Sequence, residues 1–124
     1  MPTPIEVVRH FCEQVSEGNA EQCASFFSDD AVYHNIPLDP ILGRDNIRDT
    51  IAMFLGMADK VWFETLHIVA DGPLVMTERI DHFPKDGRDI ALPVMGAFEV
   101  NGDGKITAWR DYFDMNQFTN QMNG

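Results

Sequence analysis

The second half of this chain is a succession of β-patterned segments separated by strong turn signals. Beyond residue 60, segments rich in β-branched and aromatic residues are interrupted at Asp71-Gly72-Pro73, at Asp86-Gly87 and at Asn101-Gly102-Asp103-Gly104. Asp-Gly and Asn-Gly favour tight hairpins, because glycine adopts positive φ angles without a steric penalty. We therefore expect an antiparallel meander of four long strands. Their predicted ranges are 60–70, 75–83, 89–100 and 105–115, followed by a polar tail at 117–124 with one helical turn.

The first half of the chain is predicted to be mainly helical. Thr3 and Glu6 form a capping box at the start of a helix, and Gly18 ends that helix. A second short helix, a short strand at 31–36 and a third helix at 44–57 follow. Helices followed by a run of strands are typical of an α+β fold. We expect a curved mixed or antiparallel sheet that forms a cone, with helices on its concave side and a deep internal pocket.

The composition disfavours several classes of partner. The 124 residues include 20 acidic and 9 basic side chains, and the net charge of −11 argues against nucleic acid and anionic membranes as partners. With 44% hydrophobic residues and no low-complexity run, we expect one folded domain, 1–124. No apolar run approaches the roughly 20 residues of a membrane span and no signal peptide is visible, so we expect a soluble cytoplasmic protein. Cys12 and Cys23 do not resemble a disulfide framework and are expected to pack within helices.

Two of the expected strands carry ionisable residues among apolar ones. Side chains alternate along a strand, so Arg79 and Asp81 share a face and can form a charge-assisted pair. In the last strand, Asp111 lies between Trp109 and Phe113 on one face, and burying a carboxylate without a partner is costly. Either pattern by itself favours a structural interpretation, an ion pair in the first case and core packing in the second.

The strand between these two offers Leu92 and Val94 on one face. If Leu92 and Val94 lie on the same side of the sheet as Arg79 and Asp111, all of these side chains line one concave wall. That wall then carries two carboxylates and one guanidinium in apolar surroundings. We expect no metal site, because the four histidines show no spacing that is typical of metal ligands.

Four short segments can be considered together: YHNIPL at 33–38, GRD at 43–45, TERID at 77–81 and WRDYFD at 109–114. In combination they resemble the limonene-1,2-epoxide hydrolase family. The resemblance extends from about residue 5 to residue 118, and the combined motif is far more specific than any one piece. It implies the nuclear-transport-factor-2-like cone, which agrees with the order of elements above. It also implies a homodimer and catalysis without a cofactor.

The resemblance also implies roles for individual residues. Asp111 would be the general base that deprotonates a water molecule, and Asp81 would be the general acid that protonates the epoxide oxygen. Arg79 would lie between the two carboxyl groups and hold both. Tyr33 and Asn35 would hold the water together with Asp111. The substrate pocket would be lined by Trp109, Leu92, Val94 and Phe113.

The residues themselves suit this chemistry. Opening an epoxide takes a proton for the leaving oxygen and a deprotonated water behind the carbon. Two carboxyl groups and one Arg in a dry pocket carry a net charge of −1, so one carboxyl group readily retains a proton. We therefore expect a cofactor-independent enzyme that adds water to an apolar, terpene-like or cyclic epoxide in one step and releases a vicinal diol.

Two other functions stay open from the sequence. The same cone is suited to an isomerase or cyclase of the ketosteroid isomerase or polyketide cyclase kind, in which an Asp base works with a Tyr or acidic donor. Such a site does not obviously need Arg79. The third possibility is a module that binds a small ligand without chemistry, because one fold hosts both binders and enzymes.

Overall fold

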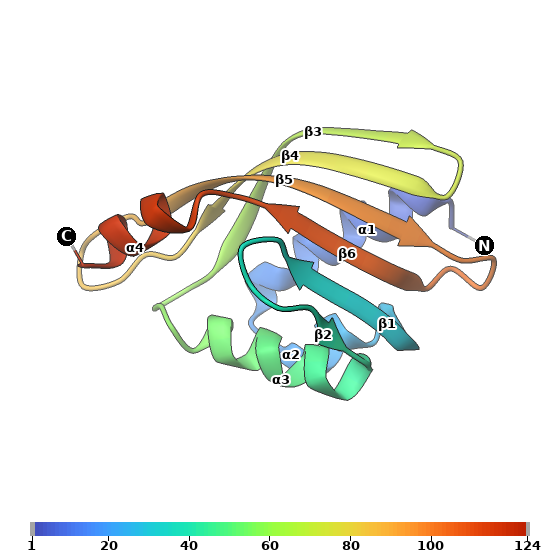
Figure 1. Ribbon diagram of the computed structural model, residues 1–124, viewed down its shortest axis with the longest axis horizontal. Helices are drawn as coiled ribbons and strands as arrows, with labels where there is room; N and C mark the ends of the chain where they lie inside the picture. The colour runs from blue at the N-terminus through green and yellow to red at the C-terminus, as the bar shows by residue number, and fades with distance from the viewer. Residues whose placement is uncertain (1, 124) are drawn as a thin grey trace.

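The computed structural model describes residues 2–123, which form six strands and four α-helices (Figure 1). The strands are β1 (Phe27–Asn35), β2 (Ile41–Leu42), β3 (Trp62–Asp71), β4 (Leu74–His82), β5 (Ala91–Val100) and β6 (Ile106–Tyr112). The helices are α1 (Pro4–Gln14), α2 (Ala20–Ala24), α3 (Arg44–Leu55) and α4 (Met115–Asn123), with the 3-10 turn η1 (Val15–Glu17) after α1.

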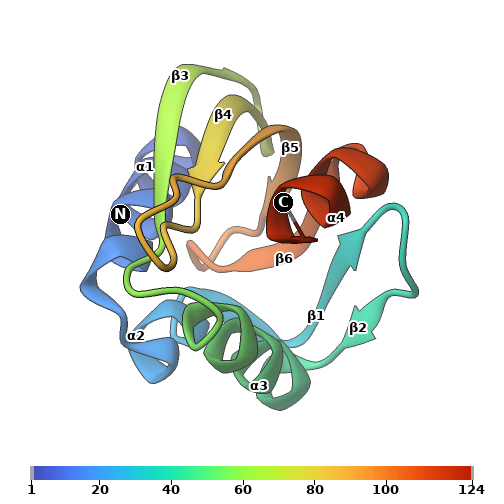
Figure 2. The same cartoon turned by 90° about the vertical axis from the view of Figure 1, so that its left-hand side faces the viewer.

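The predicted meander is confirmed, because β3, β4, β5 and β6 follow one another as antiparallel neighbours. β1 pairs with β6 in parallel, and it begins earlier than predicted because Phe27 is already paired with Ile106. The unpredicted strand β2 extends the sheet beyond β1. The strand order is β2-β1-β6-β5-β4-β3, so β2 and β3 are the two edges and the sheet does not close. The result is the expected α+β fold with a mixed, curved sheet (Figure 2).

The C-terminal segment differs from the prediction of one helical turn. β6 ends at Tyr112, and the nine-residue helix α4 begins at Met115. Asp114 explains this change, because its Oδ1 accepts hydrogen bonds from the backbone N–H groups of Asn116 at 2.9 Å and Gln117 at 3.3 Å. An aspartate in this position caps the first turn of a helix and thereby starts it.

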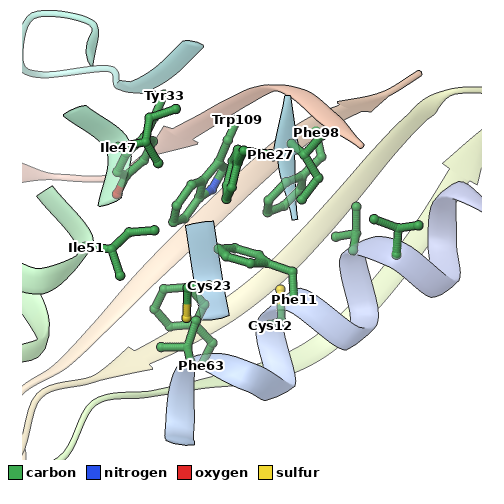
Figure 3. Packing of buried hydrophobic residues seen from close by; sticks show 14 of the residues in the cluster. Phe11, Cys12, Cys23, Phe27, Tyr33, Ile47, Ile51, Phe63, Phe98 and Trp109 are labelled. Atoms are coloured by element: carbon green, nitrogen blue, oxygen red, sulfur yellow. The ribbon is translucent and has the colours of Figure 1, made fainter. Parts of the chain in front are cut away.

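The core lies between the concave side of the sheet and the helices α1 and α3. α1 packs against β3, β4 and β5, and α3 packs against β1. The rings of Phe11, Phe27 and Phe98 surround the indole of Trp109, with centroid distances of 5.0, 5.8 and 5.7 Å (Figure 3). The two cysteines are buried in this cluster as unpaired thiols, as the helix-packing prediction requires. None of the helices within residues 2–123 is long and apolar enough to cross a membrane.

Candidate active site

The concave side of the sheet contains a cavity of about 220 Å³ with a mainly apolar wall. β4 and β5 contribute to the wall on the sheet side, and α3 and α4 contribute methionine and phenylalanine side chains on the other side. The polar residues of this wall are Tyr33, Asn35, Thr50, Asp81 and Asp111. An apolar cavity with a few convergent polar groups is the usual form of a small-molecule site.

Arg79 lies behind the cavity wall and holds both aspartates. Its Nε and Nη2 donate to the two carboxylate oxygens of Asp81 at 3.0 and 2.9 Å. Its Nη1 and Nη2 donate to the two oxygens of Asp111 at 3.2 and 2.8 Å, and Nη1 also donates to Thr77 Oγ1 at 3.1 Å. These contacts occupy all five N–H groups of the guanidinium. Because the Arg79 side chain is fully buried and its donors are used, none remains for a molecule in the cavity.

The environment of Asp81 favours the protonated form. Burial raises the pKa of Asp81 to about 6, the guanidinium of Arg79 opposes this rise, and the nearby carboxylate of Asp111 adds to it. Asp81 therefore keeps a proton up to a higher pH than an ordinary aspartate does.

Asp111 receives more donors than Asp81. Besides the two bonds from Arg79, its Oδ1 accepts a hydrogen bond of 2.8 Å from Nε1 of Trp109. The parallel pairing of β1 with β6 places Asn35 opposite Asp111 and Tyr33 opposite Trp109. Burial raises the pKa of Tyr33 well above its ordinary value, so its hydroxyl stays a neutral donor. One oxyanion with an amide and a hydroxyl beside it is suited to orienting a water molecule.

The structure brings together almost all of the residues that the sequence predicted for the site. Both aspartates lie in the cavity wall, as do the predicted polar and apolar partners Tyr33, Asn35, Leu92, Val94 and Phe113. Arg79 lies directly behind them.

Trp109 occupies a different place from the predicted one. It was expected to line the pocket, but it is fully buried and does not belong to the cavity wall. Its indole is stacked between the rings of Tyr33 at 3.8 Å and Phe98 at 5.7 Å. Trp109 therefore contacts Asp111 from behind and lies too deep to contact a molecule in the cavity.

Two residues of the site were missed in the sequence. Thr77 is buried and accepts a hydrogen bond from Arg79, and the only signal for it was its position on the Arg79 face of β4. Gly96 lies on β5 directly between Thr77 and Asp111. A glycine in the interior of a strand is itself a signal, because it often marks the close approach of another group.

His82 lies on the opposite side of β4 from the aspartates. It is buried beneath the ring of Trp62, 4.1 Å away, with Glu64 and Asp89 within 2.9 and 3.2 Å of its two nitrogens. These carboxylates raise the pKa of His82 although its burial opposes the rise. Across residues 2–123, no three His, Cys, Asp or Glu side chains are arranged to hold a metal ion.

Comparison with known proteins shows the family to which the chain belongs. The model of the limonene-1,2-epoxide hydrolase catalytic domain matches residues 2–123. The epoxide hydrolase EphG of Mycobacterium tuberculosis is 36% identical over 110 residues, which cover 87% of this chain and 71% of the relative.

Two solved structures are similar to this chain in fold, and one of them is also similar in sequence. The structure of an M. tuberculosis LEH-like epoxide hydrolase superposes with a TM-score of 0.80 at 31% identity, and the match covers 97% of this chain and 89% of that one. A SnoaL-like polyketide cyclase from Shewanella putrefaciens gives a TM-score of 0.84 at 17% identity, covering 99% and 87% of the two chains, and shares the fold alone. The chain therefore belongs to the limonene-1,2-epoxide hydrolase family and is an epoxide hydrolase.

Proposed function

We propose that this enzyme adds water to a compact apolar epoxide, terpene-like or cyclic, in one step and without a cofactor, through acid–base catalysis by Asp81, Arg79 and Asp111. The observation that supports this proposal is a single guanidinium, with every N–H in use, that holds two carboxyl groups at the wall of an apolar cavity. The apolar wall favours an uncharged substrate.

Asp111 is the general base in this proposal. Three N–H donors, two from Arg79 and one from Trp109, stabilise its ionised form. Its carboxylate, the Tyr33 hydroxyl and the Asn35 amide hold the attacking water behind the epoxide carbon. As the water oxygen bonds to carbon, its proton passes to Asp111.

Asp81 is the general acid. Its raised pKa of about 6 leaves a larger fraction protonated near neutrality than in an ordinary aspartate, and it lies in the cavity wall where an epoxide oxygen can approach. As the C–O bond of the epoxide breaks, the proton of Asp81 passes to the leaving oxygen. Arg79 has no free donor, so it cannot supply this proton or a hydrogen bond in its place. The proton lost by Asp81 equals the proton gained by Asp111, and the net charge of the site does not change.

The test is turnover of limonene oxide, cyclohexene oxide and styrene oxide in oxygen-18 water under single-turnover conditions. We expect labelled diol in the first turnover from the parent enzyme, and at least a 1,000-fold loss of turnover in Asp111→Asn. Asp103→Asn, in an exposed turn, is the matched control and should match the parent. Unlabelled first-turnover diol would mean that an enzyme carboxylate attacks the epoxide, and near-normal turnover by Asp111→Asn would exclude Asp111 as the base.

An isomerase or cyclase reaction is the second candidate. Tyr33 and a protonated Asp81 in one apolar cavity are a donor pair of the kind that stabilises an enolate. This reaction would exchange a proton next to a carbonyl group without adding water. Deuterium exchange into a cyclic ketone, with no diol formed from any epoxide, would favour it over epoxide hydrolysis.

We also propose that the outer face of the sheet pairs with a second copy of the chain. Met76, Met95 and Tyr112 are 44%, 51% and 49% exposed there, and Met95 is paired directly with Tyr112. Exposed apolar side chains gathered on one face are typical of an interface. Light scattering should give the mass of a dimer for the parent and of a monomer for Met95→Glu. Leu42→Glu, at the edge strand β2, is the control and should stay dimeric. A monomeric parent would overturn this assignment.

A further inference from the structure

β5 lies between the two strands that carry the carboxyl groups. Asp81 is on β4, Asp111 is on β6, and the strand order places β5 between them. Neighbouring strands are about 4.8 Å apart, so the backbones of β4 and β6 are separated by about 10 Å. The side chain of Arg79, which starts on β4, reaches Asp111 only by lying across β5.

The residue of β5 beneath the guanidinium is Gly96. The strand pairing places it opposite Thr77 on one side and opposite Asp111 on the other, so these three residues form one row across the sheet. A Cβ atom at this position would lie 2.7 Å from Thr77 Oγ1 and 2.9 Å from Asp111 Oδ1, and it would collide with Nη1 of Arg79. Real Cβ atoms essentially never approach other atoms this closely. The space above Gly96 is thus filled by the network around Arg79.

The backbone provides no other reason for glycine here. Gly87 in a turn has a φ of 77°, whereas Gly96 lies in an extended strand without a positive φ. Glycine in the middle of a strand costs stability relative to other residues. On the same face of β5, Val94 and Phe98 carry full side chains and are buried.

We propose that Gly96 is a positioning residue of this active site: its missing side chain is what allows Arg79 to bridge Asp81 and Asp111. The effect of Gly96 on the reaction rate rests on the proposed function, but the position of the Arg79 side chain can be measured without any substrate. A failure of this inference can therefore be told apart from a failure of the proposed reaction.

The first measurement follows the guanidinium directly in protein labelled with ¹⁵N at arginine. Because Arg79 Nε–H is buried and bonded to Asp81, its resonance should be protected from exchange with water, and Arg79→Lys assigns it. We expect Gly96→Ala to shift this resonance or to lose it through exchange. Gly102→Ala, a glycine with no atom within 4 Å of an added Cβ, should leave it unchanged. An unchanged Arg79 resonance in Gly96→Ala would overturn the proposal.

The second measurement is kinetic. A displacement of about 1 Å in a catalytic group costs on the order of 100-fold in rate. We therefore expect kcat of Gly96→Ala to fall about 100-fold, with KM within threefold of the parent and with the pH dependence of kcat displaced, because the carboxyl groups no longer share one guanidinium. If Gly96→Ala keeps the parent's kcat and pH profile, the proposal is wrong. If the parent forms no diol from any epoxide, the proposed function fails while the resonance of Arg79 still tests Gly96.

Thermal unfolding covers the case in which Gly96→Ala folds poorly. Lysine lacks the planar fork of arginine, so Arg79→Lys removes the nearest of the three groups with which the added methyl collides. The decrease in Tm caused by Gly96→Ala should be less than half as large in the Arg79→Lys background as in the parent. Equal decreases, or a double variant that is unfolded like the single one, would show that the collision lies elsewhere and would overturn the proposal.

Discussion

Nε1 of Trp109 donates a 2.8 Å hydrogen bond to Oδ1 of Asp111, two residues further along β6. Both side chains point to the concave side, as the alternation of a strand requires. The indole is immobilised by stacking on Tyr33, with 3.8 Å between ring centroids and 7° between ring planes. The carboxylate of Asp111 is therefore held from behind by a rigid donor that never contacts the cavity.

This relationship predicts the effect of Trp109→Phe. Phenylalanine keeps an aromatic ring in the core but removes the donor, so Asp111 loses one of three bonds that orient it. We expect kcat for an epoxide to fall 10- to 100-fold and the free energy of unfolding to fall by about 2 kcal/mol, since bonds to charged groups contribute about 1.5–3 kcal/mol. Steady-state kinetics and urea unfolding measure both. The control is Trp62→Phe on the outer face of the sheet, which should keep kcat within twofold of the parent. A normal kcat in Trp109→Phe would show that the hydrogen bond from Trp109 is not needed to orient Asp111.

The pKa of Asp81 predicts how activity depends on pH. A general acid works only while it is protonated, and burial raises the pKa of Asp81 to about 6. Below this pH the acid carries its proton, and above it kcat/KM should fall tenfold for each pH unit. A pH–rate profile from pH 5 to 9 measures this limb. Asp81→Asn should lose most activity and the limb with it, whereas a parent profile that stays flat to pH 9 would contradict the assignment.

Thr77→Val tests whether Arg79 needs the Thr77 hydroxyl as an acceptor for one of its N–H groups. Valine has nearly the shape of threonine but offers no acceptor to Nη1, which stays buried. A buried donor without a partner costs about 1–3 kcal/mol, so the free energy of unfolding should fall by that amount. Urea unfolding gives the value. Thr77→Ser restores the hydroxyl and should recover most of the loss, and a Thr77→Val protein as stable as the parent would show that Nη1 finds another acceptor.

The position of α4 predicts a change in substrate preference. The side-chain amide of Gln121 bonds to both the N–H and the carbonyl of Ala91 at 2.9 and 2.8 Å, and Arg88 donates to the carbonyl oxygens of Gln121 and Met122. No residue of α4 is fully buried, although the helix supplies Phe118 to the cavity wall.

Gln121→Ala should therefore loosen this wall. We expect the ratio of kcat/KM for limonene oxide to that for cyclohexene oxide to rise about threefold or more, because the larger substrate gains room. Gln117→Ala, an exposed position on the same helix, is the control and should leave the ratio unchanged. An unchanged ratio in Gln121→Ala would mean that Phe118 is held by its own packing against Phe83.

Local patterns were sufficient for the strands and for the pairs of residues within them. Turn signals predicted the meander of β3 to β6. Because side chains alternate along a strand, Arg79 shares a face with Asp81, and Trp109 shares a face with Asp111. The C-terminal helix was underestimated, because the cap from Asp114 depends on where β6 stops. The burial of His82 was also not evident, and for Trp109 the sequence offered both core packing and the pocket wall, because the face on which a side chain lies does not tell how deep it is buried.

By itself, the sequence determined which residues share a strand face, because alternation is a property of the local backbone. Only the tertiary structure decided where β1 joins the predicted meander. The parallel pairing of β1 with β6 joins segments that are far apart in the chain, and it brings Tyr33 and Asn35 to Asp111. The structure also decided that the side chain of Arg79 crosses β5 at Gly96 to reach Asp111. These relationships follow from burying one face of the whole sheet against α1 and α3, which no local pattern encodes.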